Sequence, residues 1–458
     1  MQNIYREVYS LDKRLLEHFH IPSTIMMEHA ALSIFNIIDE KFEKNSRVLI
    51  VCGGGDNGAD GIALARLLYK KYNITLYLAS EPKSELAKKQ YDILDSIGIY
   101  HSAISGEYDI IVDALFGAGL NRELDENYRE LIDRLNAMSG YKIAVDIPSG
   151  IFSSAKVGSS VFCADLTVTM GGYKLALFSD YAKDFTGEII KAELGVDSGI
   201  YEIDSDIKLL EFSDLKLPYR KRENSHKGSY GHLVVVAGEK NGAAVIAAMA
   251  GFRFGAGLVS ILGDGEVPYE LMRCESLPSN TTAIAIGMGL GSEYDESLLT
   301  DTNIALVLDA DILYHSSITS LLDRDNIVLT PHPKEFVNLL RITKLADIDV
   351  DTLQADRFGY SELFCTHFPK AVLVLKGANV IIASDKKLFI NPLGSANLAK
   401  GGSGDVLSGL IASLLAQGYS PLDSAINGSL AHTVASAKIE RNSYGLSPFD
   451  IIDMVSKI

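Results

Sequence analysis

Hydrophobic and polar positions in the first half of the chain alternate between two patterns. Short apolar runs are typical of buried strands, and longer stretches with apolar residues three or four apart are typical of helices. This alternation predicts a mostly parallel sheet with helices on both faces, and residues 1–44, which precede it, predict one or two helices. The predicted strands are Ser46–Cys52, Ile74–Leu78, Tyr108–Leu115 and Lys142–Ile147, and the predicted helices are Asp60–Lys71, Lys83–Ile97 and Asn127–Ala137.

The pattern weakens between Val196 and Lys227, in a polar, basic stretch that contains a proline, and then a second alternation begins. Its predicted strands are His232–Ala237, Leu258–Leu262, Ala283–Ile286, Ala305–Asp309, Ile327–Leu329, Ala371–Lys376 and Val380–Ala383. Its predicted helices are Ala243–Phe254, Lys334–Leu340 and Asp405–Gln417. We therefore predict two tandem α/β domains, each with three layers (α/β/α), over residues 1–210 and 211–458.

Charge and composition narrow the function classes. The 458 residues include 42 Lys and Arg against 59 Asp and Glu, a net charge of −17. Such a chain repels nucleic-acid backbones and anionic membranes, so we predict neither as a partner. No apolar run reaches the roughly 18 residues of a transmembrane helix, and the charged start is not a secretory signal. We expect a cytoplasmic protein whose four cysteines (Cys52, Cys163, Cys274 and Cys365) are buried free thiols.

The first candidate loop is GGGDNGADG, which runs from Gly53 to Gly61 and contains GxGxxG between a predicted strand and a predicted helix. That context permits a dinucleotide-binding turn. Asp56 and Asp60 oppose this interpretation, because they would place carboxylates where a pyrophosphate lies. Their oxygens suit a cation instead, and a simple tight turn remains the structural alternative.

Three further loops follow predicted strands: DALFGAGLNR from Asp113, DIPSG from Asp146, and TMGGYK ending at Lys174. Ligands of open parallel sheets bind at the carboxyl ends of strands. Asn57, Asp113 and Ser149 would therefore be oxygen donors at three strand ends, able to converge on one cation. Lys174 could meet an anion or lie in solvent, and each loop could also be an ordinary turn.

These four motifs in this order resemble the YjeF N-terminal domain family, the NAD(P)HX epimerases, over about residues 1–200, including the segment IPSTIMMEHAA. The resemblance implies a Rossmann-like fold, K⁺ held by Asn57, Asp113 and Ser149, and Asp146 as the base for proton exchange beside C6 of the damaged nicotinamide. The chain departs from the family at Asp56 (usually Asn), Ala59 (usually Gly) and His29 (usually Asn). The implied substrate contacts are Asp56, Asn57, Gly58, Ala59, Asp60, Gly117, Ala118, Gly119, Leu120, Asn121, Arg122 and Asp146.

The strongest signal in the second half is KGGSGD, which ends at Asp405 and opens a long predicted helix. Glycines allow an anion to approach the backbone, and a helix N-terminus presents free N–H groups and a positive dipole. Phosphate binding does not explain Asp405, which fits a catalytic carboxylate facing a reacting hydroxyl. The alternative is a glycine turn with a capping Asp. No GxxxxGK[ST] is present, so the chain is not a P-loop enzyme.

GxGD before a late helix resembles the ribokinase-like superfamily. Together with HKGSYGHLVVVAG, FGAGLVSI, GMGLG, DAD, TPHPKEF and LKG, it resembles the ADP-dependent NAD(P)HX dehydratases over about residues 225–458. The resemblance implies Mg²⁺ and ADP or ATP as co-substrate, although Met288, Ile312 and Val380 depart from the family pattern. It places the substrate at Ala256, Gly289, Gly291, His332 and Asp405, and the nucleotide at Lys376, Gly377, Ala378, Asn379, Val380, Gly401, Gly402, Ser403 and Gly404. His332 alone could be a turn histidine, and we interpret His432 as core or interface.

The combined interpretation is a bifunctional enzyme that epimerises R and S NADHX and NADPHX and dehydrates the S form, driven by hydrolysis of ADP or ATP. We also expect a homo-oligomer. One alternative is a ribokinase-like vitamin or sugar kinase fused to a nucleotide-binding domain, which would share GxGD and Asp405. Another is a first domain that binds without catalysing. A Rossmann dehydrogenase is disfavoured, because nothing downstream supplies a hydride-transfer pair.

Overall fold

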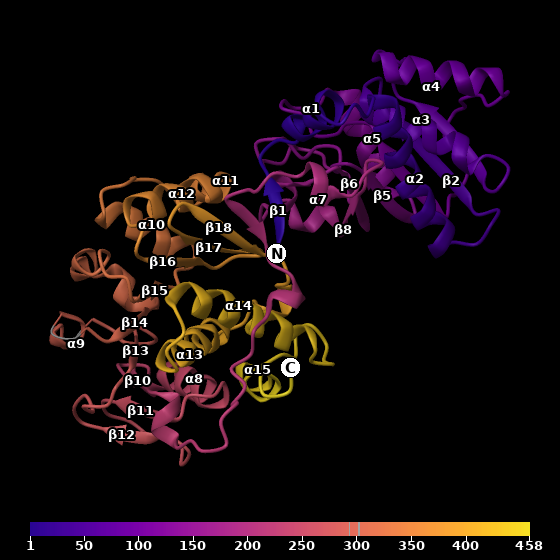
Figure 1. Ribbon diagram of the computed structural model, residues 1–458. Helices are drawn as coiled ribbons and strands as arrows, with labels where there is room; N and C mark the ends of the chain where they lie inside the picture. The colour runs from indigo at the N-terminus through magenta and orange to yellow at the C-terminus, as the bar shows by residue number, and fades with distance from the viewer. Residues whose placement is uncertain (293, 301–302) are drawn as a thin grey trace. The chain divides into compact units, whose positions relative to one another are not determined.

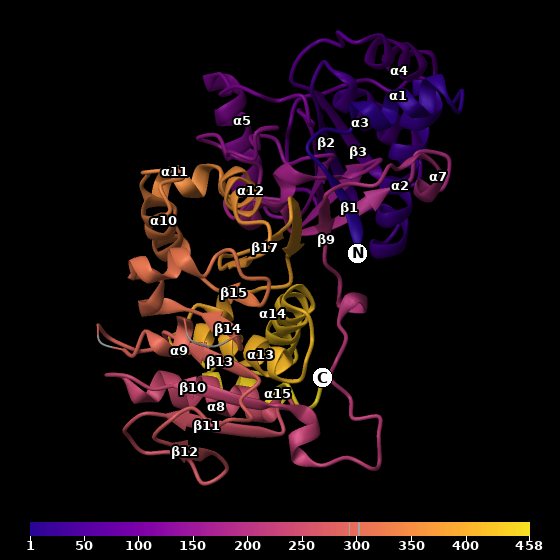
Figure 2. The same cartoon turned by 60° about the vertical axis from the view of Figure 1, so that its left-hand side comes forward.

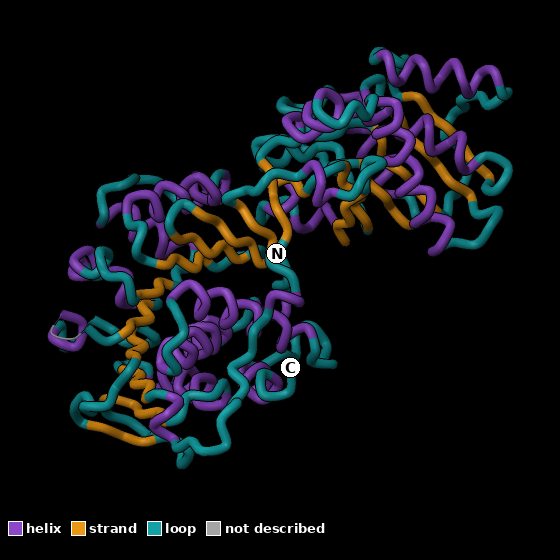
Figure 3. Tube along the Cα trace, in the orientation of Figure 1, coloured by secondary structure: helices purple, strands orange, loops and turns teal. Residues whose placement is uncertain are grey.

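The computed structural model describes residues 1–292, 294–300 and 303–458, and the chain divides into two compact units (Figure 1). The first unit is Asn3–Ser205, and the second is Asp206–Ile458 together with Met1–Gln2. Both are α/β structures built on mostly parallel strands, as predicted (Figure 3). The observed division after Ser205 and the predicted one after residue 210 differ by the strand β9 (Ile207–Leu209).

The main sheet of the first unit has the strand order β3-β2-β4-β5-β6-β8, and every neighbouring pair is parallel. Because all its strands run the same way, the loops that follow them meet at one edge of the sheet. The strands are β2 (Arg47–Cys52), β3 (Asn73–Leu78), β4 (Ile110–Ala114), β5 (Tyr141–Val145), β6 (Leu166–Met170) and β8 (Glu188–Ala192).

Strand β2 shows why both faces of this sheet are covered. Val48 and Ile50 belong to one buried cluster with residues of α2 (Ser23–Lys41), α3 (Asp56–Leu68) and α4 (Glu85–Ser96). Leu49 and Val51 belong to another, with residues of α5 (Glu126–Ala137). Successive side chains of a strand point to opposite faces, so an apolar run without polar alternation requires helices on both.

The N-terminal segment, for which one or two helices were predicted, contains two, α1 (Tyr9–Glu17) and α2, and a strand that the pattern did not reveal. This strand, β1 (Gln2–Tyr5), pairs in parallel with β7 (Tyr173–Lys174), so it joins the beginning of the unit to the TMGGYK loop. Two short helices, α6 (Lys183–Thr186) and α7 (Ser198–Tyr201), complete the unit.

The second unit has a larger sheet of order β12-β11-β10-β13-β14-β15-β16-β17-β18-β9. Its neighbouring strands are parallel except that β17 is antiparallel to both β16 and β18. The strands after β9 are β10 (His232–Val236), β11 (Leu258–Leu262), β12 (Met272–Cys274), β13 (Ala283–Ile286), β14 (Ala305–Leu308), β15 (Ile327–Leu329), β16 (Val372–Leu375), β17 (Val380–Ser384) and β18 (Lys387–Asn391).

Helix α13 (Ser403–Ala416) is the centre of this unit, packed between α8 (Asn241–Arg253) and α14 (Pro421–Ala437) against the sheet (Figure 2). Every residue from Val406 to Ala416 is buried, as expected of a helix that is apolar all round. Its N-terminus, which carries the GGSGD motif, is therefore rigidly placed. The other helices are α9 (Ser297–Thr300), α10 (Pro333–Ile342), α11 (Val350–Ala355), α12 (Arg357–His367) and α15 (Pro448–Met454).

Candidate functional site

A cavity of about 630 Å³ lies in the first unit, at the loops that follow β2, β4 and β5. It brings together most residues predicted to contact substrate: Asp56, Asn57, Asp60, Gly117, Ala118, Gly119, Leu120, Asn121, Arg122 and Asp146. Gly58 and Ala59 are buried and do not line it. Ala59 packs in the core, and a Cβ at Gly58 would lie 1.9 Å from the Gly53 carbonyl oxygen, so both residues shape the loop.

The Asp146 carboxylate is held at the cavity by an uncommon backbone conformation and by three polar contacts. Its backbone has φ of +71°, a left-handed conformation that is uncommon for a non-glycine residue. The amide of Ala118 donates to Oδ2 at 3.0 Å, and the amide of Met170 donates to Oδ1 at 3.1 Å. The Nζ of Lys174 lies 2.6 Å from Oδ1. The anion that Lys174 meets is thus the Asp146 carboxylate.

The cavity is strongly acidic around this ion pair. Burial raises the pKa of Asp60 well above its usual range, and the charges of Asp146 and Asp56 add to the effect. Burial also raises the pKa of Asp12, in α1, to about 6, against the opposing charge of Lys174. Asp12 and Lys83, which both line the cavity, were not found from the sequence because no motif contains them.

Two of the three predicted cation ligands, Asp113 and Ser149, are in direct contact. Asp113, at the end of β4, is fully buried and accepts hydrogen bonds from the Ser149 hydroxyl at 2.7 Å and the Ser149 amide at 2.8 Å. Burial raises the pKa of Asp113 to about 6. The Asn57 side chain lies beside Gly117, and its buried Nδ2 has no hydrogen-bond partner among the described residues.

The second unit has a group of charged side chains at the N-terminus of α13. The Nζ of Lys376 lies 2.7 Å from Oδ1 of Asp309 and 3.9 Å from Glu335, and 3.5 Å from where a Cβ at Gly404 would be. Ser408 donates to the other Asp309 oxygen at 2.7 Å. Lys376 is therefore a fixed cation under the glycine loop, and Asp309 is its anchor.

The electrostatics of this group follow from burial. Burial raises the pKa of Asp405 to about 6, and the charge of Asp309 adds to it while Lys376 opposes it. Burial likewise raises the pKa of Glu335 to about 7, again against Lys376. For Lys376 itself, burial acts to lower the pKa, but Asp309, Glu335 and Asp405 together hold it above its ordinary value.

The remaining residues of the glycine loop lie close by. Gly402 caps α13 with φ of +89°. The buried hydroxyl of Ser403 lies 3.2 Å from Nε2 of His432, whose pKa burial lowers to about 4. His432 is therefore a core histidine, one of the two interpretations we proposed for it, and it lies directly beneath the loop. His332 caps α10 and lies 3.1 Å from Glu335.

The structure does not gather all the predicted dehydratase contacts. Gly289, with φ of +64°, lies against Lys240 and Ala243 at the start of α8, and Gly291 lies against Glu239. Ala256 is elsewhere, because its amide donates to Ser413, eight residues beyond Asp405 in α13 or about 12 Å along the helix. The alanine that lies against Gly289 is Ala243.

The consecutive residues 376–380, which were predicted to bind the nucleotide, do not all lie at the glycine loop. Lys376 lies at the glycine loop, whereas Gly377 packs against the Arg357 guanidinium and Val380 belongs to the buried core. Ala378 and Asn379 connect them at the turn before β17, and the Asn379 side chain is buried. Asp309 and Glu335 were visible in the sequence only as members of the DAD and TPHPKEF motifs; their roles as partners of Lys376 required the fold.

The structure also bears on the expectations about membrane-spanning helices and about the cysteines. No helix among the described residues is long and apolar enough to cross a membrane. All four cysteines are free, as predicted, but the prediction that all are buried is wrong: Cys163 is exposed and Cys274 is partly exposed. Cys163 lies in the loop before β6 between the buried residues Phe162 and Ala164, and its own side chain is directed outward.

Comparison with known proteins gives matches over both units. Residues 23–176 match the YjeF-related protein N-terminus family, and residues 233–457 match the NAD(P)H-hydrate dehydratase family. The chain is 40% identical to the bifunctional NAD(P)H-hydrate repair enzyme Nnr of Helicobacter pylori, with all of both chains covered. It is 31% identical to that of Dictyoglomus turgidum, over 98% of this chain and 96% of the relative. A solved ADP/ATP-dependent NAD(P)H-hydrate dehydratase from Bacillus subtilis is 28% identical, covering 52% of this chain and 92% of its own, with a TM-score of 0.44.

Proposed function

This chain belongs to the bifunctional NAD(P)H-hydrate repair enzymes, which combine an epimerase and a dehydratase, and we propose how its residues divide the two reactions. The first unit epimerises the hydrates in its cavity, and the second dehydrates the S form at the N-terminus of α13. NADHX and NADPHX are the substrates, with ADP or ATP as co-substrate of the second reaction. We further expect the enzyme to be cytoplasmic and homo-oligomeric.

The observation that supports the epimerase assignment is the Asp146–Lys174 ion pair inside a cavity large enough for a ring and its neighbouring groups. Three donors of Lys174 are already used, on Asp146, Thr169 and the Met170 carbonyl. Lys174 therefore positions the carboxylate, and Asp146 takes the proton beside C6. Gly117 through Arg122 would lie along the substrate.

K⁺ fits the Asp113 site in this unit. Asp113 is a fully buried carboxylate without an ion pair in the described part of the chain, and Ser149 and Asn57 offer neutral oxygens near the same strand ends. A bound monovalent cation would compensate the buried charge and fix the loop that carries Gly117. Ser149 already links Asp113 to that loop, since the Phe116 amide donates to its hydroxyl at 3.0 Å.

The observation that supports the dehydratase assignment is the position of Lys376 beneath Gly404 and close to Asp405. Asp405 takes the proton of the hydrate hydroxyl as the phosphoryl group moves from the nucleotide to that oxygen. The free amides at the start of α13 and the Lys376 ammonium stabilise the transferring charge. Phosphate then departs from C6, a proton leaves C5 to solvent, and the electron pair of that C–H bond restores the ring double bond.

Mg²⁺ would enter this site with the nucleotide. Among the described residues there is no group of three or more His, Cys, Asp or Glu side chains placed to hold a metal. Mg²⁺ is commonly bound through substrate phosphates with few protein ligands, so this lack is compatible with an Mg²⁺–nucleotide complex. The bound ion would neutralise phosphate charge next to Asp309 and Glu335, which otherwise repel it.

Two substitutions test the division. Asp405→Ala should abolish nucleotide-dependent formation of NADH from the S hydrate and leave epimerisation of the R hydrate at its parental rate. Asp146→Ala should do the reverse, because the carboxylate and Lys174 belong to a different unit. Loss of both activities in either variant would contradict two separate sites, and unchanged epimerisation in Asp146→Ala would remove Asp146 from the reaction.

A further inference from the structure

The N-terminal segment contributes to the epimerase cavity although it lies outside residues 23–176, the part that matches the YjeF-related family. Val8, immediately before α1, and Asp12, in the first turn of α1, both line the cavity. No loop of the main sheet supplies them. A segment that precedes the sheet in the chain thus reaches the same space as Asp146 and Lys174.

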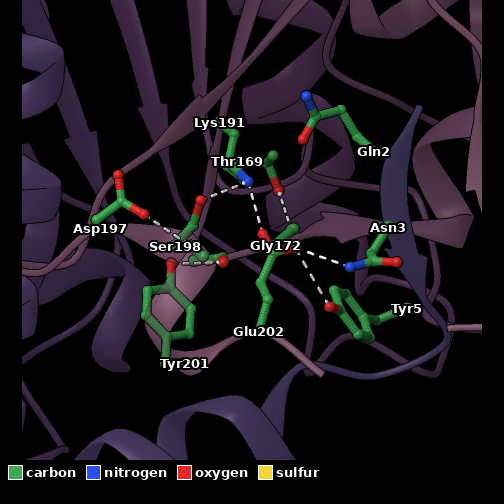
Figure 4. A network of polar contacts seen from close by, with 12 residues as sticks. Gln2, Asn3, Tyr5, Thr169, Gly172, Lys191, Asp197, Ser198, Tyr201 and Glu202 are labelled. Atoms are coloured by element: carbon green, nitrogen blue, oxygen red, sulfur yellow. Dashed lines mark hydrogen bonds and ion pairs between the residues drawn. The ribbon is translucent and has the colours of Figure 1, made fainter. Parts of the chain in front are cut away.

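This segment is fixed by polar contacts around Glu202, which Figure 4 shows from close by. One Glu202 oxygen accepts from Asn3 at 3.1 Å and from the Tyr5 hydroxyl at 3.4 Å, and the other lies 2.6 Å from the Lys191 ammonium. The Tyr5 hydroxyl also donates to the Ile203 carbonyl at 2.7 Å. Strand β1 is therefore attached to the end of the unit by side chains as well as by pairing with β7.

The contacts continue to the turn that leads into Lys174. The Tyr201 hydroxyl donates to the Gly171 carbonyl at 2.7 Å. A Cβ at Gly172 would lie 3.2 Å from the Leu11 side chain, and a Cβ at Gly171 would lie 3.9 Å from Oδ1 of Asp12. Helix α1 therefore packs directly on the Gly171–Gly172 turn, and this packing sets the place of Asp12 in the cavity.

Asp12 faces charged and titratable groups from several elements. On its own segment is Glu7, and on other elements are Lys174 in β7, Asp146 after β5, Asp60 in α3 and Tyr201 in α7. Burial, Asp146 and Glu7 raise the pKa of Asp12 to about 6, and Lys174 alone opposes them. At mildly acidic pH a proton is thus held on Asp12, while Lys174 pairs with Asp146.

We propose that Asp12 is a second catalytic residue of the epimerase, the proton donor to the hydroxyl that leaves C6, opposite Asp146 as the proton acceptor. The proposal rests on placing epimerisation in this cavity, as proposed above. The two carboxyl groups come from different elements, α1 and the loop after β5, and line the same cavity. To act on opposite faces of the ring, the two groups require the ring to lie between them in this cavity.

The reaction balances without any further reagent. The Asp12 carboxyl gives its proton to the C6 hydroxyl, the C6–O bond breaks and water leaves, while the lone pair of the ring nitrogen forms a double bond to C6. Water then adds to C6 from the opposite face, its proton passes to the Asp146 carboxylate, and the electron pair returns to nitrogen. The reverse reaction, or exchange of both protons with solvent, restores the starting charges. Each inversion replaces the C6 oxygen by one from water.

The test is Asp12→Asn in the full-length enzyme, with Glu17→Gln as the matched control because it removes a carboxylate charge from the exposed end of the same helix. Epimerisation is followed by supplying purified R hydrate and a separate excess of dehydratase. Loss of a general acid should lower kcat by about 100-fold or more, with KM changed by less than about threefold. Dehydration of the S hydrate by the same variant and its thermal unfolding report on folding.

The pH profile separates proton donation from a structural role. An acid must be protonated, so kcat/KM of the parent enzyme should fall as pH rises through about 6, the pKa of Asp12. This alkaline limb should vanish in Asp12→Asn, persist in Glu17→Gln, and persist in Asp12→Glu at reduced rate. In heavy-oxygen water, the parent enzyme should incorporate one labelled oxygen for each inversion.

Two results would overturn the proposal. One is an Asp12→Asn variant that keeps the parental kcat and alkaline limb, and the other is inversion without uptake of labelled oxygen. If epimerisation does not take place in this cavity at all, Asp146→Ala should epimerise normally, so that failure can be told apart from failure of the Asp12 role. If Asp146→Ala is inactive and Asp12→Asn is normal, only the role of Asp12 is refuted.

Discussion

Replacing Lys376 by Met would remove the ammonium group that lies among Asp309, Glu335 and Asp405. The Asp309 side chain is only 2% exposed, whereas that of Lys376 is 21% exposed. Removing one member of a buried pair typically costs about 3–5 kcal/mol, because the other charge is left uncompensated. Since Lys376 is partly exposed, we expect a value near the lower end, about 3 kcal/mol.

The assay is the unfolding of the full-length protein, followed by the transition that coincides with loss of dehydratase activity in the parent. For a unit of this size, about 3 kcal/mol corresponds to a Tm lowered by roughly 6–12 °C. The double variant Lys376→Met/Asp309→Asn should recover most of this loss, because the carboxylate closest to the Lys376 ammonium no longer carries a charge. Asp309→Asn alone should cost less than Lys376→Met, because Lys376 keeps Glu335 and Asp405.

The loss should also depend on pH, with a definite sign. In the folded parent the pKa values of Asp405 and Glu335 are about 6 and about 7, above the ordinary carboxyl range, and Lys376 acts to lower both. Without Lys376 they rise further, so the folded variant binds more protons than its unfolded chain across this range, and its stability falls as pH rises. The difference between parent and variant should therefore be larger at pH 8 than at pH 5. A cost below about 1 kcal/mol, or no recovery in the double variant, would refute the reasoning.

Three other outcomes follow from the same geometry. Asp405→Asn keeps the shape of the side chain but not the base, so dehydration should fall by about 100-fold or more with little change in Tm, as followed by NADH formation; a normal rate would contradict the role of Asp405. Gly58→Ala would place a Cβ 1.9 Å from the Gly53 carbonyl oxygen, so epimerisation and the stability of the first unit should fall while dehydration persists; an unaffected Tm would show that the loop relaxes freely. Ser149→Ala removes the hydroxyl that Asp113 and Phe116 share, so epimerisation should require more K⁺ for half-maximal rate than in the parent, and an identical K⁺ titration would argue against the site.

The helices and strands of the two units were largely predictable because their patterns are strong and local. Parallel strands buried on both faces are short apolar runs, and the strands β2, β10 and β14 were found within a residue or two of their observed ends. Strand β1 was missed because it has only four residues and pairs with the two-residue β7, more than 160 positions away. The register that joins them is a tertiary property, which no local periodicity reports.

The candidate site residues that belong to sequence motifs could be predicted from the sequence. Asp146 begins a proline-containing turn at a strand end, Asp405 follows a glycine-rich loop at a helix start, and the structure places each among charged partners. Asp12 belongs to an ordinary amphipathic helix, so its sequence signal is that of a solvated carboxylate. The positions of Ala256 and Gly289 also required the fold, which places the Ala256 amide on Ser413 and Gly289 against Ala243.

Both units use a lysine held by a carboxylate at the end of a strand, but they use it in different ways. In the first unit the three N–H donors of Lys174 are directed to Asp146, Thr169 and the Met170 carbonyl. The group that remains to take a proton in the proposed reaction is therefore the Asp146 carboxylate. In the second, Asp309 is tied by Lys376, Ser408 and the Ala310 amide, so the carboxylate is the anchor and the ammonium faces the anion site. The difference agrees with what each proposed reaction needs: epimerisation requires groups that give and take protons, whereas phosphoryl transfer develops negative charge that a fixed cation can stabilise.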